Sequence, residues 1–172
     1  MDGILPLWKE RGMTSHDCVF KLRKILKTKK VGHTGTLDPE VDGVLPICIG
    51  KATKVVEFLT DTDKAYEGEI TIGVATATKD SQSEPIAKTP VDRTLSLAEI
   101  DAAMEAMVGE SIQVPPMYSA VKVNGKRLYE YARKGLTVER PQRTIQVMHF
   151  ERISEPVYHE EDETMSWCFR VT

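Results

Sequence analysis

A glycine-punctuated stretch followed by an apolar run constrains this chain more than any other feature. Residues 32–39 read GHTGTLDP, and residues 43–50 read GVLPICIG. Glycine carries high backbone entropy and proline lacks an N–H donor, so residues 32–39 are predicted to form a structured loop. The apolar run 44–49 predicts a buried strand that anchors one end of this loop. Asp38 is therefore expected on a stiff polar loop at the edge of a core.

Asp38 has a structural and a functional interpretation. In the structural one its carboxylate accepts hydrogen bonds from nearby backbone N–H groups or from Thr36, which is the commoner role of a lone aspartate in such a loop. The whole string GHTGTLDP-x3-GVLPICIG, however, resembles the active-site motif of the TruB-type tRNA pseudouridine synthases, which modify the T-loop uridine at tRNA position 55. The resemblance implies that Asp38 is the nucleophile and that His33 contacts the substrate. Gly35 and Lys54 are expected to bind the substrate as well.

A second informative string spans residues 113–135. Two prolines at 115 and 116 predict an extended entry, Asn124-Gly125 predicts a type I′ hairpin turn, and residues 128–135 predict a short helix ended by glycine. The string resembles the family's PP-x-YSA-x-K-x-x-G-x-x-LYEYAR-x-G segment, which leads into an RNA-gripping insertion. We place that insertion at about residues 122–143 and expect Lys122 to bind substrate. Burial of the helix tyrosines is an equally good explanation of their presence.

Tyr66 lies in a segment, residues 64–74, whose alternation predicts a half-buried strand. On this pattern alone Tyr66 is a core tyrosine with a satisfied hydroxyl. The segment Asp63-Lys64-Ala65-Tyr66 nevertheless lies where the family resemblance puts the tyrosine that stacks on the target base. We therefore expect Tyr66 to bind the substrate.

The net charge of −3 hides an uneven distribution that suits a nucleic-acid partner. Residues 9–30 hold eight Lys or Arg against two acidic residues, and residues 122–143 hold seven against two. Five acidic residues and no Lys or Arg fall in 155–163. Basic runs are often only solvated faces, so charge alone leaves the question of RNA binding open.

The remaining pattern gives a fold class. Strands are predicted at 3–9 (an edge strand), 143–153 and 165–171, and loops at 76–90 and 155–164. Helices are predicted at 14–26 and 97–108, each started by a capping box (Thr14 with Asp17 and Ser96 with Glu99), and from Ala52 to near Asp61. Family resemblance, more than periodicity, implies an α/β fold of the α+β type. It has a mixed, largely antiparallel sheet flanked by helices, in one pseudouridine synthase-like catalytic domain over residues 1–172.

The resemblance implies a tRNA pseudouridine(55) synthase, an isomerase of tRNA processing that binds the T-arm. Because the last strand reaches Thr172 with its alternation unbroken, we expect truncation at the C-terminus, before the family's arginine-containing GTYIR-type string. A fragment that binds RNA or promotes tRNA folding without catalysis is thus the alternative. A guide-RNA-directed relative ranks below both, since LPICI and PP-x-YSA look more bacterial.

The remaining expectations concern cofactors and location. Three widely spaced cysteines suggest neither a disulfide framework nor a metal cluster, and no organic cofactor or metal is expected. Without a signal peptide or a membrane-length apolar run, the chain is expected to be a cytoplasmic monomer.

Overall fold

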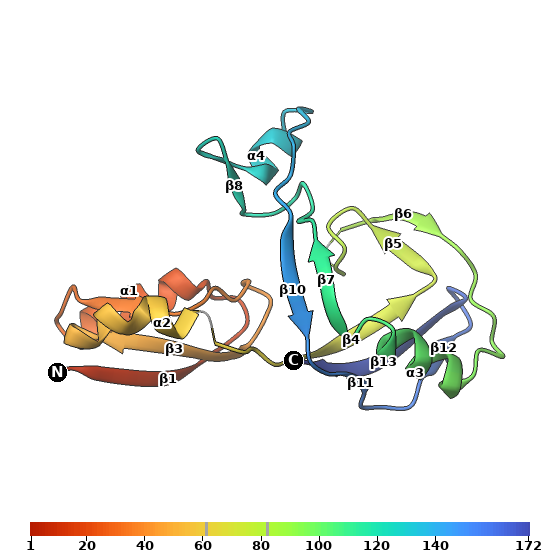
Figure 1. The fold of residues 1–172 in the computed structure, drawn as a ribbon, viewed down its shortest axis with the longest axis horizontal. Coiled ribbons are helices and arrows are strands. Elements are labelled where there is room, and N and C mark those ends of the chain that lie inside the picture. Colours follow the sequence, from red (N-terminus) through yellow and green to blue (C-terminus); the bar gives the residue numbers. More distant parts are fainter. Residues whose placement is uncertain (61, 82) are drawn as a thin grey trace. The chain divides into compact units, whose positions relative to one another are not determined.

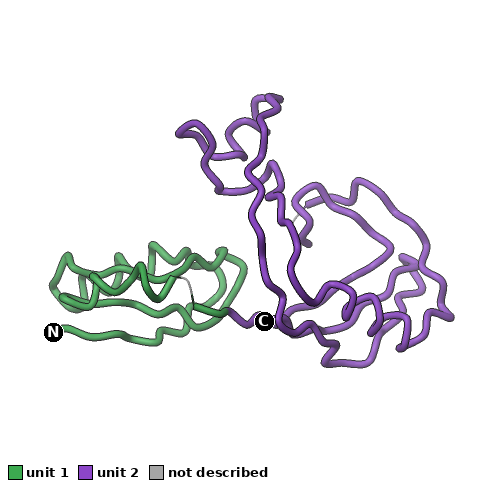
Figure 2. The backbone as a smooth tube through the Cα atoms, in the orientation of Figure 1, with its two compact units in different colours: residues 1–63 green, residues 64–172 purple. Residues whose placement is uncertain are grey.

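The computed structural model describes residues 1–60, 62–81 and 83–172. The chain divides into two compact units, Met1–Asp63 and Lys64–Thr172, which Figure 2 shows in separate colours. Each unit has its own sheet and its own buried cluster, and a single domain over residues 1–172 stays a prediction. Figure 1 labels the helices and strands.

The first unit is built on a three-stranded antiparallel sheet. Its strands are β1 (Gly3–Lys9), β2 (Val31–His33) and β3 (Gly43–Ile49), in the order β1-β3-β2. Pro6 lies on β1, at an edge of this sheet, where a missing N–H donor does least harm. After β3 the chain forms a 3₁₀-helix (Gly50–Val55) and then α2 (Val56–Thr60).

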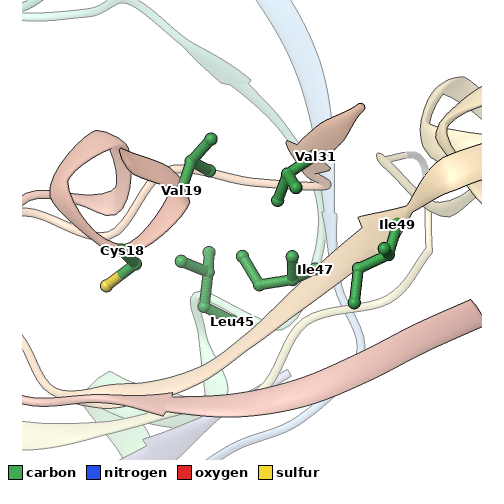
Figure 3. Packing of buried hydrophobic residues seen from close by; sticks show 6 residues of the cluster. All are labelled: Cys18, Val19, Val31, Leu45, Ile47 and Ile49. Carbon is green, nitrogen blue, oxygen red and sulfur yellow. The ribbon is translucent and has the colours of Figure 1, made fainter. Parts of the chain in front are cut away.

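Helix α1 (Ser15–Ile25) begins where the sequence predicts, at a Thr14 capping box. The amide of Asp17 donates to Thr14 Oγ1 at 3.0 Å, and the amide of Thr14 donates to Asp17 Oδ2 at 2.9 Å. These bonds from Thr14 lower the pKa of the Asp17 carboxyl. One face of α1 packs on the sheet: Cys18 and Val19 belong to one buried cluster with Val31, Leu45, Ile47 and Ile49, whose side chains Figure 3 shows.

Two predictions for this unit were wrong in part. Gly32 and His33 lie in strand β2, not in the loop, because Val31–His33 pairs with Ile49–Ile47 of β3. The helix predicted from Ala52 to near Asp61 is a 3₁₀-helix up to Val55 and α-helical over Val56–Thr60, and its predicted end at Asp61 lies outside the described residues. In the first case pairing with a buried neighbour outweighs the local preference of glycine for loops.

The second unit is organised around β13 (Thr164–Val171). It pairs on one side with β4 (Tyr66–Ile72) and on the other with β11 (Phe150–Arg152) and β12 (Val157–His159), always antiparallel. Helix α3 (Leu97–Glu105) covers this sheet, with Ile100 and Met104 packed in one cluster with Met165 and Trp167. A Ser96–Glu99 capping box starts α3, as predicted. The mixed α/β class with largely antiparallel pairing is confirmed.

Smaller antiparallel pairs complete the unit. They are β5 (Val74–Thr76) with β6 (Pro85–Lys88), β7 (Gly109–Gln113) with β10 (Arg143–Val147), and β8 (Lys122–Val123) with β9 (Lys126–Arg127). The turn between β8 and β9 has φ of 51° at Asn124 and 79° at Gly125, which confirms the type I′ prediction. Helix α4 (Leu128–Ala132) follows.

Four further predictions for this unit were incomplete. The strand at 64–74 is interrupted at Gly73, whose φ is 97°. The strand predicted at 143–153 divides into β10 and β11, and the predicted loops at 76–90 and 155–164 contain β6 and β12. Within β12, His159 is exposed, and its Nε2 lies 2.7 Å from the hydroxyl of the buried Ser166. These short strands depend on partners remote in sequence, which a local pattern does not contain.

Candidate functional site

Asp38 lies in the connection between β2 and β3 and is exposed. Among the residues that the structure describes, its carboxylate accepts no hydrogen bond and forms no ion pair. Only its backbone carbonyl is used, by the amide of Val41 at 3.1 Å. The arrangement therefore lacks the contacts that the structural interpretation of Asp38 requires.

The backbone on both sides of Asp38 is held by residues 9–15. On the near side, the amide of Leu37 donates to Ser15 Oγ at 2.9 Å, and this hydroxyl lies 3.3 Å from the Leu37 carbonyl oxygen. Beyond Asp38, the Pro39 carbonyl accepts from the Gly12 amide at 2.8 Å and from Lys9 Nζ at 3.4 Å. An exposed carboxylate is thus carried by a backbone that is fixed at both of its neighbours.

Lys9 is a positioning residue that the sequence analysis missed. It was counted among cations available to RNA, but its side chain is fully buried, which corrects that interpretation. Its ammonium group donates to the carbonyls of Glu10 at 3.0 Å and Met13 at 2.8 Å, besides that of Pro39. The sequence did contain a signal for this burial. Side chains alternate along a strand, so Lys9 lies on the same face of β1 as Leu7, which packs against the core.

The glycines of the motif have different roles. Gly43 has φ of 151° and so uses a conformation that other residues rarely adopt, whereas Gly32 and Gly35 do not. A Cβ at Gly35 would meet no atom within 4 Å. Nothing in the described chain therefore requires glycine at position 35, and close approach of a substrate stays a prediction.

His33 is half-buried at the end of β2. It pairs with Ile47 and shares the face of the sheet that carries Val31. Its Nδ1 is buried and has no hydrogen-bond partner in the described part of the chain. Lys54 is exposed in the 3₁₀-helix, in the same unit. Contacts of both residues with a substrate stay predictions.

Tyr66 is the first residue of β4 and belongs to the second unit. It shares a face with Gly68, which lies under the Phe169 ring, and with Ile70, which packs against the core. Tyr66 itself lies beyond this core, 47% exposed, and its hydroxyl makes no hydrogen bond to the described residues. It is therefore not the satisfied core tyrosine that the pattern alone predicted.

The predicted insertion at 122–143 comprises β8, β9, α4 and the loop to β10, and Lys122 is exposed at its start. Across the described residues, none of its seven cations forms an ion pair with an acidic side chain. Two guanidinium groups, of Arg127 and Arg133, lie 5.8 and 5.1 Å from the centre of the Tyr129 ring. Tyr131 instead donates its hydroxyl to the Val123 carbonyl at 3.0 Å. The insertion thus presents unneutralised positive charge beside an aromatic ring, a combination that suits RNA.

The described residues include no group of three or more His, Cys, Asp or Glu that could hold a metal ion. No helix among them is long and apolar enough to cross a membrane. The chemistry that the site offers from its own side chains is that of an accessible carboxylate, which can act as a nucleophile or a base.

Comparisons with known proteins find relatives that share most of this chain. Residues 23–166 match the family described as TruB family pseudouridylate synthase (N terminal domain). A protein named tRNA pseudouridine synthase B from Streptococcus mutans is 59% identical over 172 residues, which are 100% of this chain and 58% of that protein. A protein of the same name from Halalkalibacterium halodurans is 59% identical over 160 residues, which are 93% of this chain and 53% of that protein. The chain thus spans somewhat over half the length of these relatives.

Solved structures give a more distant likeness. One, titled "Crystal Structure of a Cbf5-Nop10-Gar1 Complex", matches 98% of this chain and 39% of that chain, with 30% identity and a TM-score of 0.59. Another, titled "Structure of H/ACA RNP bound to a substrate RNA containing 2'-deoxyuridine", matches 98% of this chain and 37% of that chain, with 26% identity and a TM-score of 0.60. The identity to the bacterial relatives is about twice as high.

Proposed function

The chain belongs to the TruB family of pseudouridylate synthases, and from this premise we propose that it carries the nucleophile of a tRNA pseudouridine synthase acting on the T-loop uridine. The observation that carries the proposal is Asp38 itself. Its carboxylate is exposed and unpaired within the described chain, while the backbone of Leu37 and Pro39 is held by hydrogen bonds. A group held in this way keeps its reactive oxygen available and loses little freedom on reacting.

Isomerisation of uridine breaks the N1–C1′ bond and forms a C5–C1′ bond. The hydrogen on C5 leaves as a proton, and N1 gains a proton. A carboxylate can assist by bonding to C1′ or to C6 of the ring, or by removing a proton from the sugar. We assign one of these roles to Asp38 and leave the route open.

A uridine in a folded loop must be flipped out before an enzyme can act on it, at a cost of a few kcal/mol. We propose that Tyr66 stacks on the flipped base, which offsets roughly 1–3 kcal/mol of that cost. Its partial exposure supports this role, as does a hydroxyl that forms no hydrogen bond with any residue that the structure describes. His33, Gly35 and Lys54 are proposed to contact the RNA in the first unit and Lys122 in the second.

The experiment is tritium release from tRNA labelled at C5 of uridine, with this chain and its Asp38→Asn variant. Asparagine keeps the size of the side chain but removes the nucleophilic charge. Release by the unchanged chain and none by the variant would support the proposal. An equal release by both would show that Asp38 is not the reacting group.

One alternative is that the chain binds RNA but does not catalyse the isomerisation. The seven cations of residues 122–143 without ion pairs in the described chain favour RNA binding whether or not catalysis occurs. In that case the chain holds the T-arm or promotes tRNA folding. Binding of labelled tRNA without tritium release from either protein would favour this alternative.

A further inference from the structure

A cavity of about 570 Å³ lies in the first unit, at the C-terminal end of α1. It is lined by an aromatic ring, a hydroxyl and four cations, from Phe20, Arg23, Lys24, Lys27, Thr28 and Lys29. The opposite end of α1 begins with Ser15, which contacts the loop of Asp38. Since a helix rises about 1.5 Å per residue, the 11 residues of α1 separate its two ends by about 16 Å. The cavity is therefore distinct from the Asp38 loop.

The cations around this cavity lack acidic partners. Within the described ranges, no ion pair involves Arg23, Lys24 or Lys27, and the same is true of Lys29. The Nε of Arg23 is buried without a hydrogen-bond partner there, although its Nη2 donates to the Val31 carbonyl at 3.1 Å. The helix dipole favours cations at this end but does not neutralise them. Like charges around one concavity repel one another, and an anion would relieve that repulsion.

Lys27 adds an observation from the backbone. Its φ is 50°, and the Thr28 amide donates to the Arg23 carbonyl at 3.2 Å, which is the geometry of a Schellman motif with Lys27 at the position where glycine is usual. A lysine is strained in this left-handed conformation and glycine is not. The chain thus places a cation at the cavity where a glycine would fit the turn better.

The aromatic ring on one side of the cavity suits a ligand that carries a sugar or a base as well as charged phosphates. Phe20 is 52% exposed, and the Lys24 ammonium lies 4.5 Å from the centre of its ring. A ring beside several cations can contact a sugar or base while the cations contact phosphates. A single free phosphate would use only a fraction of a cavity of this size.

We propose that this cavity binds the phosphodiester backbone of structured RNA, at a point several nucleotides from the one that reaches Asp38. The proposal rests on RNA being the partner, as in the proposed function, and adds a second, remote contact on α1. A free phosphate or nucleotide shares the same chemistry, so the experiment separates it from RNA.

The test compares two double variants with the same loss of charge. Lys24→Gln with Lys27→Gln alters the cavity, and Lys79→Gln with Lys88→Gln alters exposed lysines of the second unit. Binding of a fluorescent T-arm hairpin is measured by anisotropy over a range of salt. Because each phosphate contact contributes roughly 0.7–0.9 to the slope of log K against log salt, the cavity variant should lower the slope by about 1–2. Its Kd should rise about tenfold at low salt, and that of the control less than about twofold.

Shortening the hairpin stem identifies the ligand. As the stem is shortened, the difference in Kd between the cavity variant and the unchanged chain should become smaller, because a short stem lacks the phosphates that reach the cavity. A cavity variant with unchanged Kd and slope would overturn the proposal. So would competition by inorganic phosphate alone, with no effect of stem length, since the cavity would then be a small-anion site.

Lys27→Gly separates binding from folding. Glycine relieves the strain at this position, so the melting temperature should rise while affinity for the full hairpin falls. A purely structural lysine would not give opposite changes, and unchanged affinity in this variant would also contradict the proposal. A failure of the proposed chemistry would instead appear as tritium release that does not depend on Asp38.

Discussion

The hydroxyl of Ser15 offers the sharpest test of how the loop that carries Asp38 is held. Ser15 is 2% exposed, and its Oγ accepts from the Leu37 amide at 2.9 Å. In Ser15→Ala that amide loses its partner inside the protein, and a buried unsatisfied donor costs about 1–3 kcal/mol. The second contact, to the Leu37 carbonyl, is 3.3 Å long and adds little. We therefore expect a loss of about 2 kcal/mol in the free energy of unfolding.

The same change should affect turnover more than binding. Freeing the backbone beside Asp38 misplaces its carboxylate, and a displacement of about 1 Å can reduce a rate on the order of 100-fold. We expect tritium release at saturating tRNA to fall by about 10- to 100-fold, with little change in KM. Ser15→Cys keeps the shape of the side chain but weakens the hydrogen bond. Its stability and its rate of tritium release should therefore lie between those of the unchanged chain and of Ser15→Ala.

Thr14→Ala is the matched control. It removes the neighbouring hydroxyl, which caps α1 through Asp17 and, in the described chain, forms no hydrogen bond with Leu37. Loss of such a cap costs about 1 kcal/mol. Urea unfolding should detect both losses, but only the Ser15 variants should lower turnover. Unchanged stability of Ser15→Ala, or an equal loss of turnover in Thr14→Ala, would refute this account of the loop.

Two further predictions concern glycines and pH. Gly50→Ala should destabilise the first unit by about 1–2 kcal/mol from φ of 63° alone, with an added clash against the Met1 carbonyl, which lies 2.6 Å from the new Cβ. Gly35→Ala, which meets no atom within 4 Å, should stay within about 0.5 kcal/mol in the same urea titration; a comparable loss in both would be inconsistent with these contacts. Arg152 donates to both carboxylate oxygens of Asp101, at 2.9 and 3.1 Å, and lowers the pKa of that carboxyl. A lowered folded-state pKa stabilises the fold above the unfolded value of about 3.9, so Asp101→Asn should lower the urea midpoint at neutral pH, and the difference should close as pH falls below about 4. A difference independent of pH would mean that the ion pair is not its source.

The sequence by itself determined the features that depend on neighbouring residues. Thr14 with Asp17 and Ser96 with Glu99 start α1 and α3 where the capping pattern predicts. Asn124-Gly125 makes the predicted turn. Each is settled by hydrogen bonds or dihedral preferences within four residues, so no knowledge of the fold is needed. The motif around Asp38 likewise identified the family before any geometry was known.

Only the tertiary structure decided the features that depend on distant partners. Strand β2 exists because Val31 pairs with Ile49, and β12 exists because it pairs with β13. Lys9 is buried because carbonyls as far away as Pro39 surround its ammonium group. The lack of a partner for the Asp38 carboxylate among the described residues is of the same kind, since it depends on which donors the folded chain brings near. Local patterns carry no information about such pairings, because residues far apart in the chain meet only after it has folded.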